Sequence, residues 1–164
     1  YDVPAEQMNP RKLFTLTLLI TALGIGYYSM NAAPVLSDES HSYHGDTAWG
    51  TDVDEALDTA AAEDKPVLVY FWTTWCTYCE EYNANAYTDP GILDRLDEFV
   101  LLAVNLDDGS ESATRLQTEY NANYPPQHVA ITPEGEVLVE INGYAEPDAF
   151  ATYLDDARAA WESR

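Results

Sequence analysis

The chain has 164 residues, with 29 Asp and Glu against 7 Lys and Arg, which gives a formal net charge of −22. Phosphate binding requires a basic patch, so this balance excludes nucleic acid and anionic lipid surfaces as partners. The residues after Asn31 carry the whole of the net charge. Three explanations fit such a surface: a high-salt habitat that screens self-repulsion, an ordinary solvated acidic surface, or a basic partner protein.

The first apolar segment of the chain begins directly after Arg11 and Lys12. Leu13–Tyr28 is uncharged and apolar, and residues 29–33 extend it to about 20 residues, the length that spans a bilayer. Positive charge before such a segment predicts that the N-terminus is cytoplasmic and that the following residues are periplasmic or extracellular. We therefore expect a single-pass membrane protein.

This organisation divides the chain into four parts: a cytoplasmic tail (1–12), a transmembrane signal anchor (13–33), a polar tether (34–48) and a folded domain (49–164). A cleaved signal peptide is the alternative to an anchor, because Asn31-Ala32-Ala33 resembles a small-residue cleavage region. Small residues at Ala22, Gly24 and Gly26 offer a face on which the anchor could pack against another membrane helix.

The two cysteines of the chain, Cys76 and Cys79, lie in the sequence Trp-Cys-Thr-Tyr-Cys. The preceding residues 66–72 are short, β-branched and aromatic, which predicts a buried strand. Residues 80–86 contain neither Gly nor Pro and favour a helix. Cys76 would then lie at a helix N-terminus, where unpaired N–H groups and the helix dipole stabilise a thiolate. The pattern indicates a redox dithiol, with Cys79 able to resolve a mixed disulfide.

Three other kinds of site can contain a pair of cysteines. A c-type haem site requires histidine after the second cysteine, where this chain has Glu80. A structural zinc site usually needs four nitrogen or sulfur ligands, which here would require the distant His41 and His44. A purely structural disulfide is the remaining alternative to a redox dithiol, although a disulfide that closes so short a loop constrains the unfolded chain little. We expect no metal and no cofactor.

The downstream sequence predicts further elements. Residues 100–105 are apolar and predict a strand, and Thr88-Asp89-Pro90 precedes a helix. Pro126 opens a second strand, 127–131, and the turn 132–135 leads to a third strand, 136–141. After Gly143, one face of an amphipathic helix carries Phe150, Leu154, Ala157 and Trp161.

Together, the CxxC after a strand, the proline opening a later strand, the hairpin turn and the glycine before the last helix resemble the thioredoxin superfamily. Within it, the chain is most similar to the C-terminal periplasmic domain of DsbD-type thiol:disulfide interchange proteins, through residues 69–81, 87–105 and 140–154. The resemblance extends from Trp49 to Trp161. It implies an α/β, three-layer fold with a central mixed sheet, here preceded by one transmembrane helix.

The resemblance also implies roles for individual residues. Cys76 matches the nucleophile and Cys79 the resolving thiol, and the two would form a disulfide. Pro126 matches a cis-proline that faces the dithiol. Around them, the expected substrate-binding residues are Trp75, Tyr78, Pro125 and Pro126.

The sequence departs from the family pattern at three places. Tyr70 occupies the position, six residues before Cys76, where these enzymes usually carry a buried acid. Glu80 and Glu81 replace the basic residue common after the second cysteine and oppose thiolate formation. Pro125 has no N–H group to donate to an extended substrate, so broad peptide reduction is less expected.

We therefore predict a membrane-anchored, extracytoplasmic thiol–disulfide oxidoreductase. Its partner would be a client protein with a cysteine pair or a membrane electron donor, and nucleic acid is not expected. The alternative is an accessory subunit of a multisubunit membrane complex that uses the thioredoxin fold as a binding module.

Overall fold

The computed structural model describes residues 47–164. The predicted elements outside this range are the tail (1–12), the anchor (13–33) and the tether up to residue 46, with His41 and His44. Within residues 47–164, no helix combines the length and the apolar character needed to cross a bilayer.

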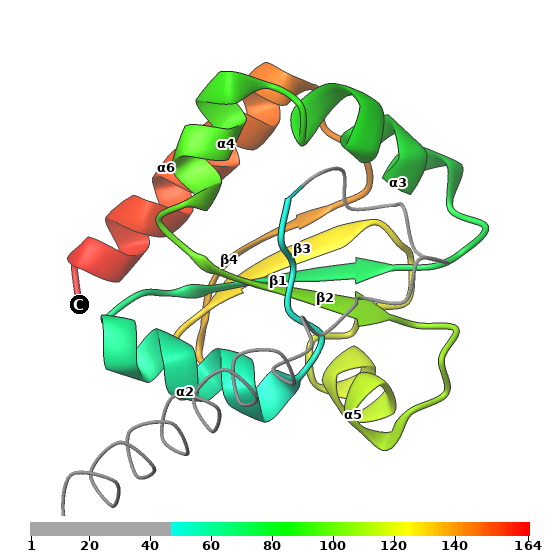
Figure 1. Ribbon diagram of the computed structural model, residues 1–164, viewed down its shortest axis with the longest axis horizontal. Coiled ribbons are helices and arrows are strands. Elements are labelled where there is room, and N and C mark those ends of the chain that lie inside the picture. The colour runs from blue at the N-terminus through cyan, green and yellow to red at the C-terminus, as the bar shows by residue number, and fades with distance from the viewer. Residues whose placement is uncertain (1–46) are drawn as a thin grey trace, which may run out of the picture. The chain divides into compact units, whose positions relative to one another are not determined.

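Four strands form one mixed sheet: β1 (Val67–Trp72), β2 (Val100–Asn105), β3 (Gln127–Ile131) and β4 (Val137–Asn142). Their order is β2-β1-β3-β4, in which β1 is parallel to β2 and antiparallel to β3, and β3 is antiparallel to β4. The predicted strands agree with the observed ones to within one residue at each end. Figure 1 shows that β1 points toward the short helix α3 (Thr77–Glu81).

The helices are α2 (Val53–Glu63), α3 (Thr77–Glu81), α4 (Pro90–Leu96), α5 (Glu111–Glu119) and α6 (Pro147–Glu162), with the π-helix η1 (Tyr82–Ala86) directly after α3. Side-chain oxygens cap three of them: Asp52 before α2, Asp89 before α4 and Ser110 before α5. Each cap oxygen accepts a hydrogen bond from a first-turn N–H that would otherwise lack a partner.

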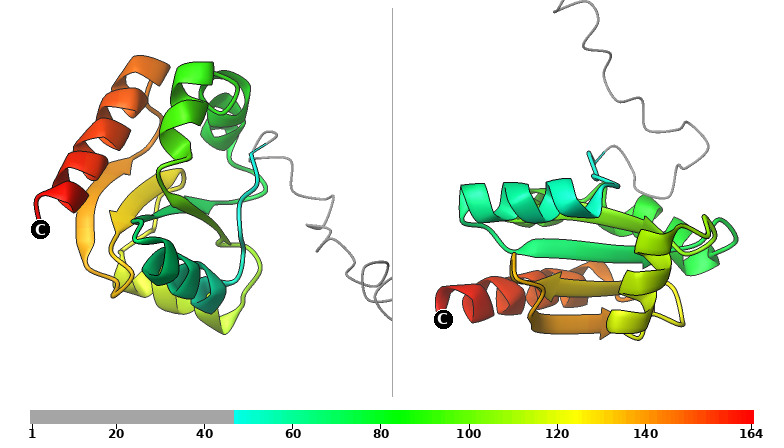
Figure 2. Two further views of the ribbon diagram at one scale, coloured as in Figure 1. Left: turned by 60° about the vertical axis from the view of Figure 1, so that its left-hand side comes forward. Right: turned by 90° about the horizontal axis from the view of Figure 1, so that it is seen from below.

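The helices cover both faces of the sheet, as Figure 2 shows, so the predicted three-layer α/β arrangement is confirmed. Successive side chains of β1 point to opposite faces of the sheet, where they pack into two different hydrophobic cores. Leu68, Tyr70 and Trp72 pack with α3, η1, α4 and α6, and this core includes both cysteines. Val67, Val69 and Phe71 pack with α2 and α5. A strand that is buried on both faces requires a continuous apolar sequence, which is what residues 67–72 supply.

Two helices differ in detail from the predictions. The helix after the dithiol begins at Thr77, directly after Cys76 as predicted, but it changes to π geometry at Tyr82. In α6, Phe150, Leu154 and Ala157 are buried as predicted, but Trp161 is only partly buried. The Arg164 guanidinium lies 3.8 Å from the centre of the Trp161 ring.

Candidate functional site

The two cysteines lie at the end of β1, where the sheet meets α3. Cys76 is the N-cap residue of α3 and is joined to Cys79 by a disulfide, with 5.2 Å between their Cα atoms. The backbone N–H of Cys79 donates to the Cys76 Sγ atom over 3.1 Å. Cys76 is 4% exposed and Cys79 is fully buried. Position and hydrogen bonding thus favour Cys76 as the sulfur that meets a partner, because a thiolate there accepts this N–H.

A cis peptide bond lies at the same end of the sheet. It joins Pro125 to Pro126, immediately before β3. Because Gln127 pairs with Phe71 of β1, Pro126 is brought to the end of β1 that leads to the cysteines. The Pro126 carbonyl accepts a hydrogen bond from the Gly143 N–H over 2.7 Å. Gly143 has a φ of +78°, which favours glycine at this contact.

One carboxylate fixes the residues on the N-terminal side of the dithiol. Asp107, in the loop after β2, accepts hydrogen bonds from the Thr74 N–H (2.7 Å), the Thr74 hydroxyl (2.8 Å) and the Trp75 indole N–H (3.2 Å). These hydrogen bonds lower the pKa of Asp107 below its ordinary value of 3.8, and the bond from the Thr74 backbone has the largest effect. Trp75 nevertheless stays 70% exposed, so its ring is oriented without being covered.

Replacing Asp107 with alanine is expected to free the Trp75 indole and to slow disulfide exchange about three- to tenfold, because Trp75 adjoins the reacting sulfur. In the unchanged protein, the Asp107 contacts persist above pH 3.8 and are lost as the pH falls through the lowered pKa. The Asp107→Ala variant should therefore lack one acid transition in tryptophan fluorescence. The control is Asp108→Ala, which removes a carboxylate from the same loop that bonds only to the Ser110 N–H. Equal fluorescence and rates in both variants would contradict this account.

Aromatic side chains join the helix that follows Cys76 to the loop between β4 and α6. The ring of Tyr78, which is 59% exposed, stacks on the ring of Tyr144 at 6.2 Å between centroids. The Tyr82 hydroxyl donates to the Gly143 carbonyl (3.3 Å) and accepts from the Ala145 N–H (3.1 Å). These bonds attach the loop between β4 and α6 to η1, so Tyr144 is held beside the helix that carries the cysteines.

The place of the usual buried acid is filled by an aromatic and histidine cluster. Tyr70 pairs with His128 across β1 and β3, and their rings stack at 4.7 Å. The Tyr87 hydroxyl lies 2.7 Å from His128 Nε2. Burial lowers the pKa of His128 to about 3, so its ring is neutral near pH 7. The buried polar side chains of residues 47–164 are Thr73, Gln127, His128 and Thr132, and no carboxylate is among them.

The structure brings the predicted site residues together. The contacts described above place Trp75, Tyr78, Pro125 and Pro126 at the end of the sheet where the Cys76–Cys79 disulfide lies. The sequence did not reveal the parts played by Asp107, Tyr144 and the Tyr87–His128 pair. Asp107 had one usable signal, because it follows a strand that runs parallel to β1 and so ends at the same edge.

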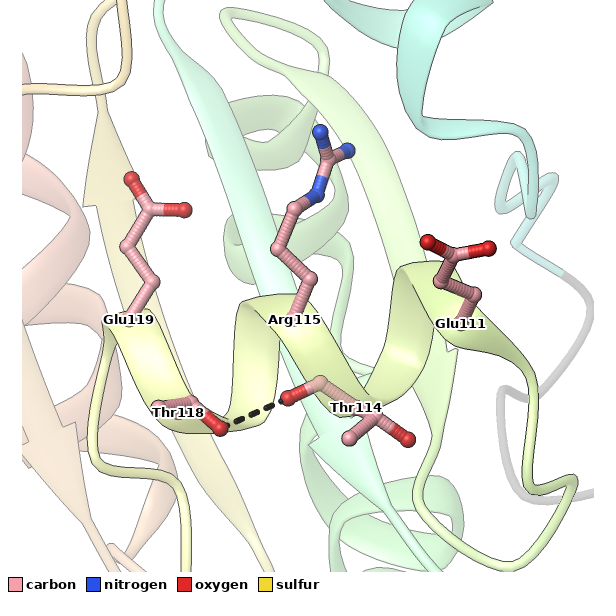
Figure 3. Close-up of a pocket in the computed structure, with 5 residues that line it drawn as sticks. All are labelled: Glu111, Thr114, Arg115, Thr118 and Glu119. Atoms are coloured by element: carbon pink, nitrogen blue, oxygen red, sulfur yellow. Dashed lines mark hydrogen bonds between the residues drawn. The ribbon is translucent and has the colours of Figure 1, made fainter.

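A shallow hollow on α5 contains none of these residues. It is lined by Glu111, Thr114, Arg115, Thr118 and Glu119, all from that one helix (Figure 3). The hydroxyls of Thr114 and Thr118 donate to carbonyl oxygens of their own helix, at Ser110 and Thr114. Polar groups from different elements do not converge there, so the candidate site is the dithiol.

Known proteins resemble the part of the chain that contains the dithiol. The thiol:disulfide interchange protein DsbD of Cronobacter sakazakii is 28% identical over 124 residues, which are 74% of this chain and 21% of that protein. The chain thus spans about a fifth of the length of this curated relative. The oxidised C-terminal domain of Neisseria meningitidis DsbD superposes with a TM-score of 0.59 at 25% identity, covering 68% of this chain and 100% of that domain.

A thioredoxin from Thermus thermophilus gives the same TM-score of 0.59 at 28% identity, covering 66% of this chain and 85% of that protein. The model of the thioredoxin-like domain family matches residues 53–158, which contain the disulfide, the cis-proline and all four strands. The chain therefore belongs to the thioredoxin-like domain family.

Proposed function

We propose that this protein is a thiol–disulfide oxidoreductase that exchanges the Cys76–Cys79 disulfide with a cysteine pair of another protein. The observation that carries the proposal is the disulfide at the N-cap of α3, beside the cis Pro125–Pro126 bond. Similarity to thiol:disulfide interchange proteins supports the same chemistry.

In the reducing direction, the Cys76 thiolate attacks one sulfur of a client disulfide. The client S–S bond breaks, a mixed disulfide with Cys76 forms, and the first client thiolate leaves and takes up a proton. The Cys79 thiolate then attacks the Cys76 sulfur, forms the Cys76–Cys79 disulfide and releases the second client thiolate. Two electrons pass from the protein dithiol to the client, and the oxidising direction is the reverse sequence.

The exposed residues around the disulfide would receive the client segment. Trp75 and Tyr78, the neighbours of the cysteines in the sequence, offer exposed apolar rings, and the Tyr78 ring stacks on that of Tyr144. An extended segment beside the cis bond can donate to carbonyl oxygens there, but Pro125 supplies no N–H in return. The client thus loses one main-chain hydrogen bond, worth about 0.5–1.5 kcal/mol.

We further propose that residues 13–33 anchor the protein in a membrane and that the domain faces the periplasm or the exterior. Anchoring would hold the dithiol at a high effective concentration near a client or an electron donor in the same membrane. The alternative, a complex subunit that uses the fold only for binding, predicts that loss of both cysteines leaves its biological activity intact.

The proposal is tested by mixing the reduced full-length protein with a peptide disulfide under anaerobic conditions. For each peptide disulfide that is reduced, one Cys76–Cys79 disulfide is expected to form, as measured by alkylation and mass spectrometry. The matched control is the Cys76→Ser/Cys79→Ser variant, which should leave the peptide oxidised. A wild-type protein that keeps both thiols while the peptide stays oxidised would refute the proposal.

The acidic residues that follow the dithiol are expected to influence its reduction potential. Glu80→Lys should lower the pKa of the Cys76 thiol and make the disulfide more oxidising, because a cation in α3 stabilises the thiolate of the reduced form. The measurement is the ultraviolet titration of the thiolate, with Glu136→Lys on the β3–β4 turn as the charge-matched control. A titration of Glu80→Lys that superimposes on the wild type would eliminate the electrostatic explanation.

A further inference from the structure

The surface around the disulfide is formed by four segments that are distant in sequence. We call them the rim: residues 73–81, 106–110, 121–126 and 143–146. Asp107 joins the second segment to the first through Thr74 and Trp75. The Tyr78–Tyr144 stack joins the fourth to the first, and the Gly143–Pro126 hydrogen bond joins the fourth to the third.

The charged side chains of the rim are all acidic. It contains no lysine and no arginine, whereas its acidic side chains are Glu80, Glu81, Asp107, Asp108 and Glu146, all exposed. Three large aromatic side chains also project from it, with Trp75 70%, Tyr78 59% and Tyr124 83% exposed. Exposed aromatic rings that surround a reactive centre mark an interaction surface.

The cations of the described residues lie on other elements, and four of them make ion pairs. The pairs are Lys65–Glu63, Arg95–Asp155, Arg158 with Glu98 and Glu162, and Arg164–Glu134. Arg115 lies on α5 between Glu111 and Glu119. The carboxylates in these ion pairs all lie outside the rim.

We propose that the rim docks a client segment that carries lysine or arginine beside its cysteine; this inference rests on the proposed function. Carboxylates steer a cationic segment toward Cys76 and repel an acidic one. Rings such as Trp75 and Tyr124 accept the same cations on their faces, a contact that an exposed aliphatic residue cannot make. The rim thus selects its clients by charge and compensates for the hydrogen bond that Pro125 does not make.

The test compares three disulfide-linked peptide dimers that differ only in the residues flanking cysteine: arginine, serine or glutamate. Each is mixed with the reduced full-length protein, and the second-order rate of dithiol oxidation is measured. At about 20 mM salt, the arginine peptide should react at least about tenfold faster than the glutamate peptide. At about 1 M salt, this ratio should fall to about twofold, because screening shortens the range of the charges.

Matched variants separate the effect of the rim carboxylates from the effect of the overall net charge. Glu80→Gln/Glu81→Gln removes two rim charges, and Asp58→Asn/Glu136→Gln removes two exposed charges elsewhere. The ratio of the arginine to the glutamate rate cancels any change in the thiol itself, so it reports recognition alone. We expect the rim variant to lower that ratio at least about threefold more than the control variant does.

A second pair of variants tests the aromatic contact. Tyr124→Leu should slow the arginine peptide severalfold, whereas Tyr124→Phe should keep the wild-type rate, because only the latter retains a ring. Equal rates for the three peptides, or equal effects of rim and control neutralisation, would overturn the inference and leave the proposed function standing. If none of the peptides reacts, the proposed function itself fails.

Discussion

Cys79→Ser is expected to leave the protein covalently joined to its partner, whereas Cys76→Ser is expected to form no such adduct. Cys76 caps α3 and keeps 4% of its surface exposed, whereas Cys79 is fully buried. Only Cys76 can therefore reach a client sulfur. Without the Cys79 thiol, the mixed disulfide lacks the nucleophile that would resolve it.

The adduct is measured by acid quenching, alkylation and a non-reducing gel, followed by mass spectrometry of the linked peptides. Cys79→Ser should show at least about tenfold more adduct than the wild type, because intramolecular resolution by Cys79 outpaces release by an outside thiol. The Cys76→Ser/Cys79→Ser variant corrects for nonspecific capture. Adducts that form through Cys79 in Cys76→Ser would reverse the assignment of the attacking thiol.

The second large effect concerns His128, which is buried among aromatic rings of the core that contains both cysteines. The folded protein keeps His128 neutral down to a pKa of about 3, whereas the unfolded chain protonates it at its ordinary pKa of 6.5. Below pH 6.5 the unfolded state therefore binds a proton that the folded state does not. The free energy of unfolding should fall by about 1.4 kcal/mol for each pH unit as the pH drops from 6.5 toward 3.

His128→Phe isolates this contribution. The variant loses the hydrogen bond between Tyr87 and His128, which costs about 1–3 kcal/mol at every pH, but it has no group to titrate at position 128. Urea unfolding of both proteins between about pH 6 and pH 5 avoids most carboxylate titration. The wild-type advantage should shrink as the pH falls, by about 1.4 kcal/mol per unit. Parallel pH profiles for the two proteins would show that His128 is not held neutral by burial.

The strands and the place of the dithiol could be predicted because local sequence determines them. Residues 67–72 are apolar at every position, as a strand buried on both faces requires. The change from this strand to a helix-forming segment places Cys76 at the N-cap. The cis bond before Pro126 followed from the resemblance and is confirmed.

The rest of the site depends on contacts between residues far apart in the chain. Asp107 is 32 residues from Trp75, and Tyr87 is 41 residues from His128, so no local pattern reveals either pair. The π-helix begins at Tyr82, whose hydroxyl bonds the loop at residues 143–145. The local sequence does not encode such a long-range bond, and it predicted a helix over residues 80–86 without its π geometry.

The central claim is that the Cys76–Cys79 disulfide is a redox couple and not a structural crosslink. Its reduction potential tests this claim most directly, measured by equilibrating the full-length protein in graded dithiothreitol and glutathione buffers. We predict reversible two-electron reduction at a potential above about −300 mV, with the fold retained in the reduced form. A potential below about −300 mV, together with unfolding on reduction, would identify a structural disulfide and contradict the account.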